Sequence, residues 1–190
     1  MSGEVDWSWK LREAIERIKT QYMHIGRSSG APFLAIIYPP EAEVAVLKEW
    51  QTLSRSLGEE FDFEIIDILP ITASVLDDLG INNVLESIRD PMPGSNPESE
   101  LGSLWIDAIK NEVKAKAYIE GTKKKVIVLE NLAALYPATT PHAVMQELWS
   151  SDDVILDCPV VLLIPGTLNE PRVYSFLNIA KEFVYRGDVL

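Results

Sequence analysis

The sequence predicts an α/β fold, a three-layer sandwich in which helices flank a mostly parallel central sheet of four to five strands. Short, almost purely apolar runs, Phe33–Tyr38, Val126–Leu129 and Val160–Ile164, are typical of strands that are buried on both faces. Segments with apolar residues at helical spacing alternate with these runs. The length of 190 residues is enough for one domain with its own core, so we expect residues 1–190 to form a single α/β domain.

The N-terminal part contains two predicted helices and two predicted strands. Apolar residues at steps of three and four predict an amphipathic helix over Val5–Met23. A glycine-containing loop follows, and the buried strand Phe33–Tyr38 comes next. A second helix is expected over Glu41–Leu57. The segment Phe61–Leu69 first alternates and then becomes continuously apolar, so it predicts a second strand.

The middle of the chain is predicted to be helical on both sides of a loop. Two short helices are expected over Ile71–Gly80 and Asn82–Ile88, separated at Gly80. Asp90–Glu100 contains three prolines and a glycine, which predict a mobile loop. A long helix is expected over Leu101–Glu120.

The C-terminal part should complete the sheet. The strand at Val126–Leu129 leads to a predicted helix over Pro141–Ser150, which Thr139 or Thr140 could cap. The strand at Val160–Ile164 is expected to end at the turn residues Pro165–Thr167. A short helix over Val173–Ile179 and a possible edge strand within Phe183–Leu190 would follow.

Composition limits the class of protein. Seventeen Lys and Arg against twenty-nine Asp and Glu give a formal net charge of −12, which disfavours non-specific binding to duplex DNA. The cluster Lys123–Lys125 is read as solvated charge at the entry to a strand, so no direct DNA binding is expected. No apolar run approaches the roughly 18 residues of a membrane span, and no secretory signal pattern is visible. The single cysteine, Cys158, fits a reducing compartment, and we expect a cytoplasmic protein.

One possible chemical site lies at the carboxyl ends of the predicted strands, where ligands of parallel sheets usually bind. Glu130 and Asn131 follow a buried strand, as the acidic residue of a nucleotide-triphosphatase site does, and His142 and Thr167 could converge with them. The glycine- and lysine-containing phosphate loop that such a site requires is missing. His142 has no second histidine or cysteine at metal-ligand spacing, so we assign no catalytic, cofactor-binding or metal-binding residue. A helix-start histidine bonded to a loop carbonyl is the favoured interpretation of His142.

Two tryptophans near the start of the chain are candidates for protein binding. Trp7 and Trp9 lie on the charged N-terminal helix, and tryptophan is enriched at the energetic centres of protein interfaces. Packing of this helix on its own sheet explains them equally well.

The chain resembles BrxB, a small component of bacterial BREX phage-defence systems, over about residues 30–180. Five segments carry the resemblance: Pro32-Phe33, Tyr38-x-Pro40-x-x-Glu43, Phe63–Leu69 with Asp67, Tyr136-Pro137 with His142, and Pro159–Gly166. The chain departs from the family where Glu130-Asn131-Leu132-Ala133 stands in place of Thr-Gly-x-Gly.

The resemblance implies a non-catalytic, cytoplasmic adapter that needs no cofactor. Its implied partners are an alkaline-phosphatase-like protein (PglZ) above all, and also the DNA methyltransferase PglX and the large ATPase BrxC. The alternative is a degenerate or atypical nucleotide-binding or hydrolase domain that uses the carboxyl end of the sheet.

Overall fold

The computed structural model describes residues 7–118 and 120–190, and it confirms the expected α/β fold with a mostly parallel central sheet. Five strands form this sheet in the order β2-β3-β4-β1-β7, and every neighbouring pair is parallel. They are β1 (Phe33–Tyr38), β2 (Phe61–Asp67), β3 (Lys124–Glu130), β4 (Val160–Glu170) and β7 (Asp188–Val189). Two further strands, β5 (Val173–Phe176) and β6 (Ala180–Phe183), extend β4 as an antiparallel hairpin.

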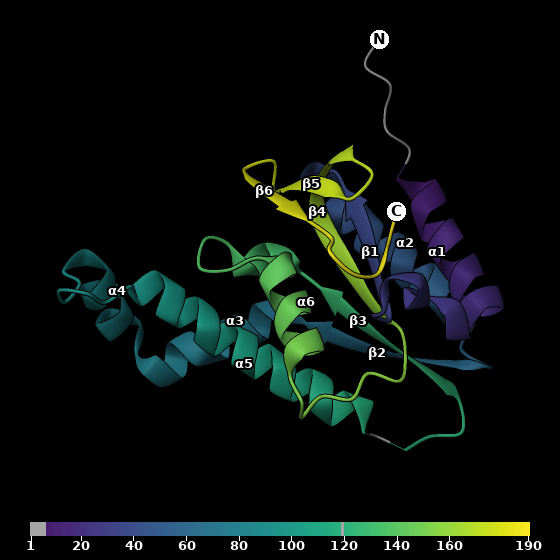
Figure 1. Ribbon diagram of the computed structural model, residues 1–190, viewed down its shortest axis with the longest axis horizontal. Helices are drawn as coiled ribbons and strands as arrows, with labels where there is room; N and C mark the ends of the chain where they lie inside the picture. Colours follow the sequence, from purple (N-terminus) through teal and green to yellow (C-terminus); the bar gives the residue numbers. More distant parts are fainter. Residues whose placement is uncertain (1–6, 119) are drawn as a thin grey trace, which may run out of the picture.

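Helices cover both faces of the sheet (Figure 1). Helices α1 (Ser8–Gln21) and α2 (Glu43–Arg55) pack on one face, and α5 (Pro97–Ala117) and α6 (Pro141–Ser150) pack on the other. Between β2 and α5 the chain forms α3 (Ile68–Leu79) and α4 (Ile81–Arg89), and α4 lies at the end of the molecule far from α1 (Figure 1). Short 3-10 helices at Tyr22–His24, Arg27–Ser29, Pro40–Ala42 and Leu132–Leu135 join these elements.

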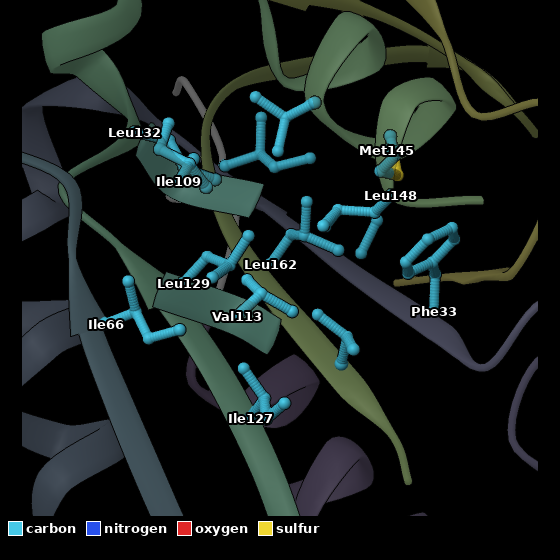
Figure 2. Packing of buried hydrophobic residues seen from close by; sticks show 14 of the residues in the cluster. Phe33, Ile66, Ile109, Val113, Ile127, Leu129, Leu132, Met145, Leu148 and Leu162 are labelled. Carbon is cyan, nitrogen blue, oxygen red and sulfur yellow. The ribbon is translucent and has the colours of Figure 1, made fainter. Parts of the chain in front are cut away.

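The apolar runs become strands because their side chains fill two separate cores. Successive residues of a strand point to opposite faces, so the run 33–38 of β1 divides between the two clusters. Figure 2 shows the cluster under α5 and α6, where Ile109 and Met145 from the helices meet Leu129 and Leu162 from the sheet. Burial on both faces is the reason why these strands contain no alternating polar residues.

Helix caps decide the boundaries that the apolar pattern left open. The helix expected over Pro141–Ser150 has those bounds, because the Thr140 side chain accepts a hydrogen bond from the Ala143 amide. The long helix begins at Pro97 rather than Leu101, since Asn96 caps it through the Ser99 amide and proline is favoured in the first turn. The loop expected over 90–100 is therefore shorter at its C-terminal end. The Val5 and Asp6 part of the first predicted helix lies outside the described residues.

The strand predicted over Phe61–Leu69 is two residues too long. Asp67 ends β2, and its carboxylate accepts a hydrogen bond from the Leu69 amide at 3.0 Å, which starts α3. Ile68 is fully buried as the first residue of this helix. The apolar run hid the boundary because buried strands and buried helix starts have the same composition.

The helix predicted over Val173–Ile179 is wrong, and so is the sharp strand end at Pro165–Thr167. Strand β4 runs through these residues to Glu170 and pairs with β5, with Gly166 opposite Phe176. Tyr174 and Phe176 are fully buried while their neighbours are half-buried, which is the period of two of a strand. A Cβ on Gly166 would lie 2.4 Å from the Ser175 carbonyl oxygen, so this pairing needs glycine.

Candidate functional site

Carboxylates gather at the carboxyl end of the sheet, where the sequence suggested a site. Glu130 ends β3 beside Asp67 at the end of β2. Asn131 adopts a left-handed backbone (φ 58°), and its amide donates to Asp67 Oδ1 at 2.8 Å. Tyr38 ends β1, and its hydroxyl lies 3.4 Å from Glu43 Oε1 at the start of α2.

The surroundings of the carboxylates at this edge of the sheet favour their protonated form and disfavour a bound anion. Burial raises the pKa of Glu130, and the neighbouring Asp67 charge raises it further. Burial also raises the pKa of Glu43, although the hydrogen bond from Tyr38 acts in the opposite direction. The buried Lys10 ammonium donates to the Ile37 carbonyl at 2.8 Å, and burial lowers its pKa. A phosphate would meet several carboxylates here, so the geometry does not favour a nucleotide at this edge.

The glycine loop before β1 has a structural role. Gly26 and Gly30 both have a left-handed backbone. The Gly26 amide donates to Asp188 Oδ2 at 3.0 Å, and Ser29 Oγ accepts from the Gly187 amide at 2.6 Å. These hydrogen bonds hold the C-terminal strand β7 against β1, at the end of the sheet opposite to the carboxylates.

The other predicted residues do not converge on Glu130. His142 begins α6, and its Nδ1 lies 2.9 Å from the Phe183 carbonyl oxygen, which agrees with a histidine bonded to a backbone carbonyl. Thr167 in β4 donates to Asn178 Oδ1 at 2.7 Å, in the turn between β5 and β6. Tyr136 is exposed and precedes a cis peptide bond to Pro137. Glu130 and His142 line different surface hollows. In the described part of the chain, no group of three His, Cys, Asp or Glu side chains could hold a metal ion.

The two N-terminal tryptophans have different surroundings. Trp7 is half-buried and packs against the core under α1 and α2. Trp9 is 48% exposed, so only this one presents its ring to solvent. One of the two candidate anchors is thus largely accounted for by packing within the molecule.

A group of exposed apolar residues lies elsewhere, on a helical arm that consists of residues 68–104. Not one residue of α4 is buried. The exposed apolar side chains of the arm are Leu69, Leu79, Ile81, Leu85, Ile88, Met92 and Leu104. Ile81, Leu85 and Ile88 follow one another at steps of four and three, so they share one face of α4. Scattered exposed apolar residues are normal, whereas a shared apolar face on a helix without buried residues, such as this stripe on α4, is a candidate interaction surface.

The sequence around this stripe is acidic. Residues 77–100 contain six carboxylates and a single basic side chain, Arg89. The carboxylates are Asp77, Asp78, Glu86, Asp90, Glu98 and Glu100. A groove lined in part by Leu79, Leu101 and Leu104 separates α4 from α5. We define the arm surface as the seven exposed apolar residues of the arm together with these carboxylates. The spacing of α4 was visible in the sequence, but its exposure was not.

Comparisons with known protein families, with curated proteins and with solved structures found no match to this chain. None of the helices formed by the described residues is long and apolar enough to cross a membrane.

Proposed function

We propose that this protein is a non-catalytic adapter of a BREX-type bacterial phage-defence complex, and that it binds a larger PglZ-like partner through the arm surface. The methyltransferase PglX and the ATPase BrxC are further candidate partners, and the protein would act in the cytoplasm. The uncovered apolar stripe of α4 is the observation that carries the proposal. It combines an apolar centre with a polar rim, as protein interfaces do.

Two further observations support an adapter. The segments that resemble BrxB form β1, β2, β4 and the connections between them. They therefore belong to the central sheet and its connections. The carboxylates at the carboxyl end of the sheet oppose an anionic substrate. Any chemistry on DNA would then belong to the partners.

Co-purification tests the proposal. The tagged wild-type protein is expressed with each candidate partner. The double variant Leu85→Glu and Ile88→Glu is expressed in the same way. Val44→Glu on α2 is the matched control, because Val44 is 82% exposed and α2 packs against the sheet face opposite to α5 and α6. We expect the wild-type chain and the Val44→Glu control to retain the PglZ-like partner and the double variant to lose it.

Two results would overturn this proposal. The wild-type chain could remain alone with all three candidates, which would remove the adapter function. Alternatively, the double variant could bind as well as the control, which would remove the arm surface as the docking site.

A further inference from the structure

A second feature, independent of the arm, is an aromatic hollow between α6 and the C-terminal segment that begins at the last residue of β6. Trp149 and His142 come from α6, and Phe183, Tyr185 and Arg186 come from the C-terminal segment. The floor is formed by the buried residues Phe33 and Met145, which also belong to the core cluster shown in Figure 2. The hollow has a volume of about 370 Å³. This is within the size range of sites for small molecules, roughly 300–1,000 Å³.

The rings of the hollow form a stacking platform. The centroids of His142 and Phe183 are 4.8 Å apart, and Phe183 meets Tyr185 edge to face at 6.1 Å. The Arg186 guanidinium lies 5.2 Å from the Trp149 ring and 5.4 Å from the Tyr185 ring. Flat cations held against aromatic faces extend the surface on which a planar ligand can stack.

The polar groups of the hollow are available to a ligand. Arg186 forms no ion pair with any described residue, and its one hydrogen bond, to the Ser29 carbonyl, is long at 3.4 Å. An unpaired guanidinium is unexpected in a chain with a net charge of −12. The Nδ1 of His142 is bonded to the Phe183 carbonyl, so Nε2 is the ring nitrogen left for a ligand. Gln146 adds an amide at the rim.

The segment that carries these residues is held in place before any ligand binds. Arg172 Nε donates to the Val184 carbonyl at 2.8 Å, and Arg172 Nη2 donates to the Gly187 carbonyl at 3.0 Å. These two bonds lie on either side of Tyr185 and Arg186. The platform is therefore preorganised, which lowers the entropy cost of binding.

We propose that this hollow binds a nucleotide, with the base stacked among Trp149, Phe183 and Tyr185 and a phosphate on Arg186. A purely apolar ligand would leave the guanidinium without an anionic partner, and a simple anion would leave the aromatic walls unused. The amide of Gln146 and Nε2 of His142 provide hydrogen bonds for the edge of a base.

Calorimetric titration of the full chain with AMP, GMP, CMP and UMP tests this site. Adenosine and ribose 5-phosphate separate the contributions of the base and the phosphate. Trp149→Ala should weaken nucleotide binding by roughly five- to one-hundred-fold, the effect of losing one stacked ring. Trp9→Ala is the matched control, because Trp9 is 48% and Trp149 is 42% exposed, and it should leave affinity unchanged. Arg186→Gln should weaken AMP binding more than adenosine binding.

Short single strands identify the source of the nucleotide. An affinity that rises with the length of a single-stranded oligonucleotide and falls with salt indicates that the ligand is a nucleic-acid strand. An affinity for a mononucleotide equal to that for the oligonucleotides indicates a free nucleotide. Thermal melting of each variant verifies its folding, and Phe183→Ala replaces Trp149→Ala if the latter does not fold. The proposal is overturned if no nucleotide binds at millimolar concentration. It is also overturned if folded Trp149→Ala and Arg186→Gln variants bind as the wild-type chain does.

Discussion

At the scale of single residues, Glu130 shows how the sheet edge differs from a catalytic centre. Its carboxylate ends the central strand β3 next to Asp67, and no described residue donates a hydrogen bond to it. Both burial and the neighbouring charge disfavour the ionised form, so its pKa is raised. At neutral pH the ionised Glu130 carboxylate therefore lowers the stability of the folded protein.

This leads to a prediction for Glu130→Gln. A carboxyl group whose pKa is higher in the folded than in the unfolded state destabilises the fold when it is ionised in both states. The variant should therefore be more stable than the wild-type protein at pH 7. The difference should shrink as pH falls through the raised pKa, and it should vanish below the ordinary value of 4.5, where both states are protonated. Urea denaturation across this pH range measures it, with the exposed Glu41→Gln as control. A constant difference at all pH values would contradict the assignment.

Gly102 gives a second prediction at this scale. A Cβ at this position of α5 would lie 2.2 Å from the Ala138 carbonyl oxygen, in the loop before α6. Alanine improves helix propensity by about 1 kcal/mol, but the clash displaces either the helix or the loop. We expect Gly102→Ala to destabilise the protein by about 1–3 kcal/mol, the usual cost of overpacking. Gly121→Ala is the control, because nothing lies within 4 Å of its Cβ. Equal denaturation midpoints for both variants would show that the helix and the loop move apart at little cost in free energy.

At the scale of elements, α4 and β3 differ in how far their apolar residues are buried. Strand β3 buries Val126–Leu129 completely between two helical layers. Helix α4 buries nothing and packs chiefly on α3 and α5. Its apolar stripe therefore contributes little to folding, which is why we propose it as a docking surface.

A pair of substitutions measures this contrast. Leu129→Ala removes a fully buried side chain and should cost about 2–5 kcal/mol of the free energy of unfolding. Leu85→Ala in α4 removes a side chain that is 44% exposed and should cost less than about 1 kcal/mol. Both values come from chemical denaturation. A large loss of unfolding free energy in Leu85→Ala would mean that α4 is needed for the fold. It would then no longer support the arm surface as a docking site.

At the scale of the whole molecule, the sheet and its covering helices form one part, and the arm projects from it (Figure 1). The arm holds few of the buried residues, since both core clusters lie against the sheet. Its end should therefore open by local unfolding more readily than the sheet.

Hydrogen exchange tests this difference. Amides of α4 should exchange much faster than those of β1 and β3 in the isolated protein, and they should become protected when the partner binds. Peptide-resolved mass spectrometry gives both measurements, with the β5–β6 hairpin, which lies outside the arm, as internal reference. Protection of α4 equal to that of β3 in the isolated protein would contradict the picture of a loosely held arm.

Four features were predictable from the sequence alone: the α/β class, the buried strand β1, the helix α6 with its threonine cap, and the lack of a phosphate-loop motif. These features depend on local composition and spacing, which are visible in any window of the chain. Tertiary structure alone decided the β5–β6 hairpin, where Gly166 lets another backbone approach and burial rather than spacing reveals the period of two. It also decided the exposure of α4 and the aromatic hollow, whose residues His142 and Phe183 are 41 positions apart. Such contacts have no local signal, because they arise only when distant segments pack on the same sheet.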